Sequence, residues 1–203
     1  MVKNSQYTNQ FVINEFNSWF LKAQEFYKKL KLDNANAMSL CTVDESMQPS
    51  NRMVLLKNVN ESGFVFFTNY ESKKAKSIEI NNKVSLLFYW LPLNKQVRIE
   101  GEVEKISKEE SEKYFHSRPY LSKIGAWASK QSSEMKSSMD LHKEIIKYTA
   151  KFKTSVPYAE HWGGYVVKPN YVEFWEEKPF RLHNRVVYIK QKDNEWLKKH
   201  IYP

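Results

Sequence analysis

Apolar residues recur along the chain with two different spacings. Between residues 12 and 30 they follow a helical period, which predicts an amphipathic helix that buries Phe16, Trp19 and Phe20. From Ala37 onward apolar and polar residues alternate, as they do in half-buried strands. The alternation predicts strands at 37–43, 50–57, 64–68, 84–90 and 96–106, with turns at 44–49 and 58–63.

The second half of the chain mixes helical and strand-like segments. Ser107 and Glu110 form a capping-box pattern that predicts a helix start, and Ser117 is expected to cap a second short helix that reaches Ile124. Helices are also predicted near 69–82 and at 139–152, and strands at 164–167, 171–176, 181–189 and 195–201. Short strands with few helices between them favour an antiparallel barrel. We therefore expect a mainly β (α+β) protein with peripheral helices, composed of a helical extension (1–33) and one globular domain (34–203).

Composition limits the possible functions only loosely. The 203 residues carry a net charge of +9, which suits nucleic acid, an anionic membrane or phosphorylated small molecules. The one cysteine, Cys41, excludes an internal disulfide and fits a reducing cytoplasm, and its apolar neighbours predict a buried thiol. We see neither a signal peptide nor a membrane-spanning run, so a cytoplasmic protein is expected. The histidines lack metal-ligand spacing, so no metal site is predicted.

Two helical segments carry candidate phosphate ligands. Tyr114, Arg118 and Ser122 are spaced by fours across a helix junction, where all three side chains can donate to phosphate oxygens. Lys73 and Lys74 fall in the first turn of another helix, where cations oppose the helix dipole unless an anion binds there. Solvated basic side chains are the alternative interpretation of both segments.

Two strands add charges at informative positions. In 50–57 alternation places Arg52, Val54 and Leu56 on one face and Met53, Leu55 and Lys57 on the other. In 181–189 it places Arg181, His183 and Arg185 on one face, within about 14 Å of one another. Aligned like charges repel unless they share a negative group, although an exposed polar face is the alternative.

Several motifs together resemble one known family. They are RMVLLK (52–57), FFTNYESKKA (66–75), KQVRIEGEVEKIS (95–107), YFHSRPYLSKIGAWASKQSS (114–133), HWGGY (161–165), VEFW (172–175) and RLHNR (181–185). In this order they resemble the pyridoxine/pyridoxamine 5′-phosphate oxidases, from about Asn34 to the end of the chain.

The resemblance implies an FMN-binding split β-barrel that forms a homodimer with flavin at the subunit interface. The implied reaction oxidises pyridoxine 5′-phosphate or pyridoxamine 5′-phosphate, which are phosphorylated forms of vitamin B6, to pyridoxal 5′-phosphate. Hydride would pass from substrate C4′ to flavin N5, and O2 would reoxidise the flavin and give H2O2. The flavin carries the difficult chemistry, so the protein supplies orientation and charge. Neither nucleic acid nor a membrane is implied as a partner.

The resemblance also assigns roles to residues. Arg181 and His183 would be catalytic and would flank the substrate ring, while the substrate phosphate would be bound by Lys57, Tyr114, Arg118 and Ser122. The cofactor would be bound by Arg52, Met53, Val54, Leu55, Leu56, Lys57, Phe67, Thr68, Lys73, Lys74, Gln96, Gln131, Ser132, Trp175 and Arg185. Two positions depart from the family pattern: Asn184 replaces a usual Asp, and Lys73 replaces a frequent Arg.

Three other functions remain open on the sequence. A split-barrel flavoenzyme with another substrate, such as a phenazine-pathway oxidase, would have no need for the complete phosphate pocket. A non-catalytic protein that binds FMN or pyridoxal phosphate would bind flavin without its reduction by substrate. A basic nucleic-acid binder would stack bases on Trp90, Tyr114 and Trp127, and its affinity would fall steeply with salt.

Overall fold

The computed structural model describes residues 6–203. Its strands are β1 (Gln6–Tyr7), β2 (Ala37–Val43), β3 (Pro49–Leu55), β4 (Asn58–Asn60), β5 (Gly63–Asn69), β6 (Lys83–Trp90), β7 (Lys95–Lys105), β8 (Trp162–Glu176), β9 (Asn184–Lys190) and β10 (Trp196–His200). Its helices are α1 (Asn9–Lys29), α2 (Lys73–Ile80), α3 (Lys108–Ser117), α4 (Tyr120–Ala128) and α5 (Ser138–Phe152), with short 3-10 turns at Leu91–Leu93 and Pro179–Arg181.

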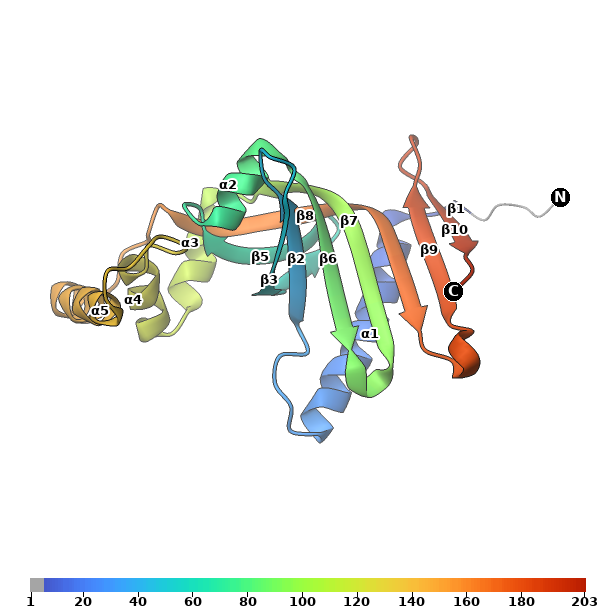
Figure 1. Ribbon diagram of the computed structural model, residues 1–203, viewed down its shortest axis with the longest axis horizontal. Coiled ribbons are helices and arrows are strands. Elements are labelled where there is room, and N and C mark those ends of the chain that lie inside the picture. Colours follow the sequence, from blue (N-terminus) through green and yellow to red (C-terminus); the bar gives the residue numbers. More distant parts are fainter. Residues whose placement is uncertain (1–5) are drawn as a thin grey trace.

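All ten strands in the described part of the chain belong to one curled antiparallel sheet (Figure 1). Most follow the order β1-β10-β9-β8-β7-β6-β2-β3, and β4 pairs only with β5. The first half of β8 pairs with β5 along one edge and its second half pairs with β9, while β7 runs along its other edge. The sheet therefore splits at β8, and the predicted antiparallel split barrel with peripheral helices is confirmed.

Helix α1 fills the concave side of this sheet. Its buried Val12, Ile13 and Phe16 belong to the main core. The Phe16 ring lies 4.8 Å from that of Phe64 and 5.1 Å from that of Phe88, between centroids. Thr8 caps the helix by accepting a hydrogen bond from the Phe11 backbone N–H at 3.2 Å. The predicted helix with an aromatic core face is confirmed.

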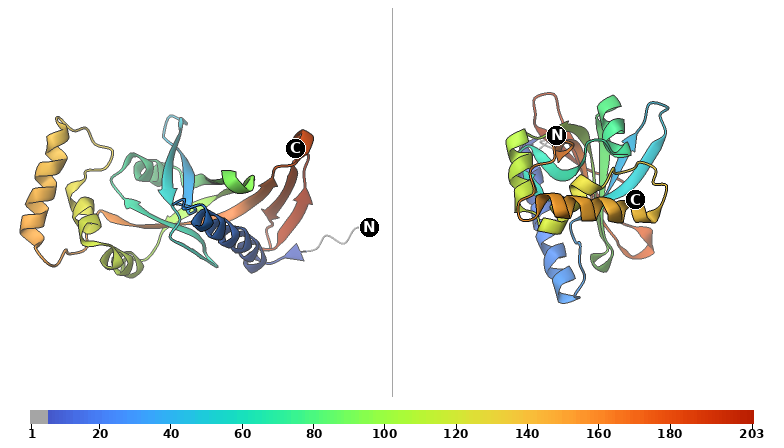
Figure 2. Two further views of the ribbon diagram at one scale, coloured as in Figure 1. Left: turned by 90° about the horizontal axis from the view of Figure 1, so that it is seen from below. Right: turned by 90° about the vertical axis from the view of Figure 1, so that its left-hand side faces the viewer.

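Helices α3, α4 and α5 gather at one end of the molecule, and β9 and β10 lie at the other (Figures 1 and 2). A second, smaller core holds the three helices against the start of β8, with Phe115, Ile124 and Trp162 at its centre. The predicted start of α3 is confirmed, because Ser107 Oγ accepts the Glu110 N–H at 3.1 Å. This second core supports the helices above the end of the sheet.

Several predicted details are wrong. Ser117 does not cap α4, because it ends α3 and donates to the Tyr114 carbonyl, while Pro119 precedes α4. Strands 164–167 and 171–176 are a single strand, β8. The pairing of β7 with β8 shifts register between Glu100 and Gly101, and this bulge accommodates Pro169 without a ladder hydrogen bond. The thiol of Cys41 is only partly buried.

The largest error concerns residues 181–185. Alternation predicted a strand there, but Arg181 lies in a tight turn and β9 begins at Asn184. Phe180 and Arg181 both adopt left-handed backbone conformations, with φ of 59° and 61°. Such angles interrupt a strand, so Arg181, His183 and Arg185 do not share one strand face. Residues 58–60, predicted as part of a turn, form the short strand β4.

Candidate active site

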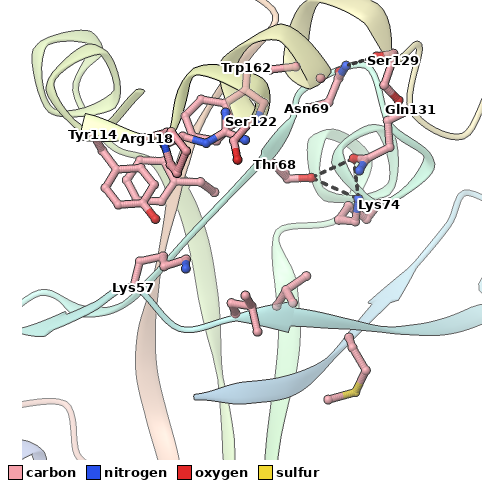
Figure 3. Close-up of a pocket in the computed structure, with 17 residues that line it drawn as sticks. Lys57, Thr68, Asn69, Lys74, Tyr114, Arg118, Ser122, Ser129, Gln131 and Trp162 are labelled. Carbon is pink, nitrogen blue, oxygen red and sulfur yellow. Dashed lines mark hydrogen bonds between the residues drawn. The ribbon is translucent and has the colours of Figure 1, made fainter. Parts of the chain in front are cut away.

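A cavity of about 620 Å³ opens between β3, β5 and the helices α2, α3 and α4 (Figure 3). Three cations line it, Lys57, Lys74 and Arg118, and none of its described lining residues is acidic. An excess of positive charge in a concave site favours an anionic ligand. Predicted site residues that line the cavity are Met53, Val54, Leu55, Lys57, Phe67, Thr68, Lys74, Tyr114, Arg118, Ser122 and Gln131.

Lys74 forms the centre of one wall. Lys74 is 8% exposed, and its ammonium group donates to Thr68 Oγ1 at 3.0 Å and to Gln131 Oε1 at 2.9 Å (Figure 3). It also donates to Ser72 Oγ at 3.2 Å. All three acceptors are neutral. Burial, and then the charge of Arg52, lower the Lys74 pKa from 10.5 to about 8. A buried ammonium without a carboxylate partner is stabilised by an anion that enters the cavity.

The opposite wall combines aromatic rings with a guanidinium group. Tyr114 stacks on Phe67 with 3.9 Å between ring centroids, and Phe67 stacks on Trp162 at 5.3 Å. The Arg118 guanidinium lies over the Trp162 ring, 4.3 Å from its centroid. Its Nη1 is buried and has no hydrogen-bond partner among the described residues. An unpaired donor of this kind can bind an anion.

Tyr114, Arg118 and Ser122 converge on this cavity, as predicted. They come from α3, from the junction, and from the first turn of α4. Burial lowers the pKa of Arg118, which the neighbouring Tyr114 partly offsets. Gly125 lies one turn further along α4, and a side chain at this position would meet no atom within 4 Å, so the backbone of α4 borders open space. Lys57 lies across the cavity from this wall (Figure 3).

Four predicted cofactor residues lie near the cavity without lining it. Arg52 instead donates to the Leu40 carbonyl at 3.0 Å and to Thr42 Oγ1 at 2.8 Å on β2. Leu56 is 3% exposed in the main core. Lys73 and Ser132 line a separate hollow of about 440 Å³.

Another set of predicted residues lies elsewhere on the sheet. Gln96, Trp175 and Arg185 occupy one row across β7, β8 and β9, because Gln96 pairs with Trp175 and Trp175 pairs with Arg185. None of these residues, nor Arg181 or His183, lines the cavity. Strand β9 lies at the opposite end of the molecule from α3, α4 and α5 (Figures 1 and 2). A single chain therefore holds the predicted site residues in two separate groups.

His183 and Trp175 are in contact within this second group. Their ring centroids lie 4.7 Å apart, and His183 Nδ1 accepts the Lys178 backbone N–H at 3.3 Å. This hydrogen bond places the proton of the neutral imidazole on Nε2. Arg185 donates through Nε to Glu173 Oε1 at 2.6 Å. The usual carboxylate is missing at Asn184, yet Arg185 still has a carboxylate partner from β8.

Sequence reasoning missed Trp162, Asn69 and Glu173. Trp162 belongs to the HWGGY motif and Glu173 to VEFW, so both motifs were noticed without a role for these side chains. A carboxylate within an apolar strand is a signal that could have identified Glu173, since a buried charge requires partners. Asn69 belongs to FFTNYESKKA, but its place in the cavity depends on where β5 ends.

Residues 6–203 contain no helix with both the length and the apolar character required to cross a bilayer. Over the same residues, His, Cys, Asp and Glu side chains form no group of three or more suited to a metal ion.

Comparisons with known proteins identify relatives over most of the chain. Residues 23–151 match the family model of pyridoxamine 5′-phosphate oxidase, and residues 162–203 match the model described as the pyridoxine 5′-phosphate oxidase C-terminal dimerisation region. Pyridoxine/pyridoxamine 5′-phosphate oxidase of Haemophilus influenzae is 47% identical over 191 residues, which cover 94% of this chain and 89% of the relative. The enzyme of the same name from Ralstonia pickettii is 46% identical and covers 91% of this chain and 85% of the relative.

Solved structures show the same fold at lower identity. PhzG from Burkholderia lata, in complex with tetrahydrophenazine-1-carboxylic acid, superposes with a TM-score of 0.84 at 22% identity, over 92% of this chain and 91% of that one. A pyridoxamine 5′-phosphate oxidase-related, FMN-binding protein from Nostoc punctiforme superposes with a TM-score of 0.71 at 18% identity, over 90% and 96% of the two chains.

Proposed function

Because the chain belongs to the pyridoxamine 5′-phosphate oxidase family, a family of oxidoreductases, we propose that it oxidises pyridoxine 5′-phosphate or pyridoxamine 5′-phosphate to pyridoxal 5′-phosphate. FMN is the cofactor in this proposal and O2 is the electron acceptor. One observation supports this proposal most directly. The cavity contains no acidic side chain among its described lining residues, and it has a cation without a carboxylate partner on each of two facing walls, Lys74 on one and Arg118 on the other. Two cationic walls suit two phosphate groups, one from the cofactor and one from the substrate.

The wall around Lys74 fits the phosphate of FMN. Lys74 has only neutral acceptors, and Thr68 and Gln131 lie within hydrogen-bond distance of it. A phosphate there would raise the lowered Lys74 pKa and recover the cost of its burial. Lys73 starts the same helix but lines the neighbouring hollow, so its side chain would have to turn towards the cavity to reach the phosphate. Met53, Val54 and Leu55 offer an apolar strand to the ring system.

The facing wall fits the substrate phosphate. Arg118 has a free buried donor, and the hydroxyl groups of Tyr114 and Ser122 line the same cavity. Lys57 adds an exposed ammonium group from the link between β3 and β4. This set would favour phosphorylated over unphosphorylated B6 compounds, because without the phosphate the buried Arg118 Nη1 remains unpaired.

FMN held by these residues would supply a two-electron acceptor, N5, for a hydride from substrate C4′, and O2 would accept the electrons and give H2O2. The pyridoxamine substrate consumes one water in addition and releases ammonia. The chain itself binds both phosphates and orients the reacting groups, so no nucleophilic side chain is required.

A homodimer would complete this site. Residues 162–203, which match the dimerisation-region model, include Trp175, Arg181, His183 and Arg185. We infer that these side chains reach the cavity of the partner subunit across a two-fold interface, where Arg181 and His183 of the partner subunit flank the substrate ring. Exposed apolar side chains support this arrangement at both places: Met53 is 63% exposed beside the cavity, and Phe180 is 92% exposed near Arg181.

The test is anaerobic mixing of FMN-loaded protein with pyridoxine 5′-phosphate, followed by the visible flavin spectrum. We expect rapid bleaching that air reverses, with pyridoxal 5′-phosphate as the product. Unphosphorylated pyridoxine is the matched control and should bleach the flavin far more slowly. A flavin that binds and stays oxidised with every B6 phosphate would favour another substrate or a non-catalytic binding protein, and failure to bind FMN would refute the proposal.

A further inference from the structure

Glu173 is a buried carboxylate with two guanidinium partners. It lies in β8 between Val172 and Phe174 and is 2% exposed. Its Oε1 accepts a hydrogen bond from Arg185 Nε at 2.6 Å. Its Oε2 accepts from the Tyr171 hydroxyl at 3.0 Å and forms an ion pair with Arg98, whose Nη2 lies 2.9 Å away. Burial raises the pKa of Glu173, but Arg185 and Arg98 outweigh that effect and hold the pKa below its usual range. The group is therefore ionised at neutral pH.

Arg185 is held at two of its three guanidinium nitrogens. Nε donates to Glu173, and Nη1 donates to the Tyr202 carbonyl at 3.0 Å. The backbone is fixed as well, because the Ile201 N–H donates to the Arg185 carbonyl at 3.1 Å. Within residues 6–203, Nη2 makes no hydrogen bond that would occupy it. The planar guanidinium therefore has one defined orientation, in which Nη2 is the nitrogen left available to a ligand.

Arg185 lies beside other residues that are predicted to bind the cofactor. Arg185 stands in one cross-strand row with Trp175 and Gln96, all three of which are predicted cofactor residues. Glu173 precedes Trp175 by two residues and so lies on the same face of β8. Glu173 is therefore adjacent to the row of Gln96, Trp175 and Arg185 but is not one of its members. Arg98 pairs with Glu173 in the neighbouring row and keeps the carboxylate ionised.

We propose that Glu173 is a positioning residue: together with the Tyr202 carbonyl it fixes the Arg185 guanidinium so that Nη2 is presented to bound FMN. The inference rests on the proposed function, since it requires FMN at this face. A donor that is already oriented loses less rotational freedom when it binds, so the clamp raises FMN affinity without touching FMN. The alternative is a purely structural role, in which Glu173 only balances the charge of Arg98.

A double-mutant cycle separates the two roles. FMN dissociation constants are measured by flavin fluorescence quenching for wild type, Glu173→Gln, Arg185→Ala and the double variant. Glu173→Gln should weaken FMN binding about tenfold, and should add less than about twofold once Arg185 is absent. The matched control is Glu100→Gln, which removes an exposed carboxylate 3.8 Å from Arg98 and touches no part of Arg185. The control should stay within about twofold of wild type.

Several results would overturn the inference. Glu173→Gln with wild-type FMN affinity would do so, and so would an equal loss in the wild-type and Arg185→Ala backgrounds. If Glu173→Gln fails to fold, deletion of Tyr202 and Pro203 tests the inference instead. The deletion removes the carbonyl that accepts from Arg185 Nη1, and it should spare the fold because Tyr202 is 94% exposed. Unchanged FMN affinity after that deletion would contradict the clamp. If wild-type protein does not bind FMN at all, the proposed function fails instead.

Discussion

Replacement of Lys74 by Met should stabilise the protein while it weakens cofactor binding. The fold lowers the Lys74 pKa from 10.5 to about 8, chiefly through burial. A shift of about 2.5 units corresponds to roughly 3 kcal/mol of destabilisation at neutral pH, where the lysine is charged in both states. Met keeps the length and apolar stem of the side chain but leaves Thr68, Ser72 and Gln131 with one partner fewer. We therefore expect a net gain of about 1–2 kcal/mol, or about 2–8 °C in Tm.

The pH dependence identifies the source of that gain. Between pH about 8 and 10.5 the unfolded chain holds the Lys74 proton while the folded chain releases it, so the stability contributed by this residue rises with pH across that window. Below pH 8 the full cost is present. Lys74→Met has no such titration, so its advantage over wild type should be largest at pH 7, should vanish at roughly pH 9, and should reverse to a deficit of about 1–2 kcal/mol by pH 10.5, where the neutral lysine keeps its hydrogen bonds without the cost of charge burial.

The assay is denaturant or thermal unfolding of the apoprotein at one protein concentration, because bound FMN or a change in dimer population would alter the apparent stability. FMN affinity, measured separately by fluorescence quenching, should fall about 10- to 150-fold with the loss of a charge-assisted phosphate contact. Lys76→Met is the control, since Lys76 is an exposed lysine of the same helix. If Lys74→Met is no more stable than wild type at pH 7, or binds FMN normally, the reasoning about this buried cation is wrong.

Three further substitutions test other parts of the account. Arg118→Ala should lower kcat/KM for pyridoxine 5′-phosphate about 10- to 100-fold, because it removes a donor to the substrate phosphate. Its FMN affinity should change little. Steady-state kinetics and an FMN titration measure the two effects. Arg181→Ala should leave FMN bound but slow flavin reduction severely in anaerobic stopped flow, and an unchanged rate would remove Arg181 from the mechanism. Phe16→Ala should lower the unfolding free energy by about 3–5 kcal/mol in denaturant titration, since Phe16 is 0% exposed between α1 and the sheet.

The periodicity of the chain predicted most of the fold, since burial on one face leaves a regular pattern. Strand β2 and helix α5 match their predicted positions within one residue. The pattern failed where backbone conformation is set by tertiary contacts. The left-handed angles of Phe180 and Arg181 occur without glycine, so residues 181–185 still read as an alternating strand. The bulge at Gly101 likewise depends on the close approach of the Lys168 carbonyl, which no local pattern records.

The sequence predicted part of the candidate site for the same reason. Spacing by fours predicted that Tyr114, Arg118 and Ser122 converge, and the cavity confirms it. The extended backbone at Arg118 between α3 and α4, and not one continuous helix, brings them together. Spacing could not show that Arg181 and Arg185 lie at the other end of the sheet, because their separation from the cavity follows from the strand order. The role of Glu173 was also hidden, since its partner Arg98 is remote in sequence and meets it only through β7–β8 pairing.

The central claim is that this chain is an FMN-dependent oxidase of B6 phosphates whose site is completed by two subunits. The most direct test combines two impaired variants, Arg118→Ala and Arg181→Ala, as a heterodimer isolated with two different affinity tags and assayed at a substrate concentration well below KM. If each site takes Arg118 from one subunit and Arg181 from its partner, one site of the heterodimer is intact and the other carries both defects. The account predicts about half of the wild-type pyridoxine 5′-phosphate oxidase activity per dimer. A heterodimer no more active than its two parent variants would contradict it.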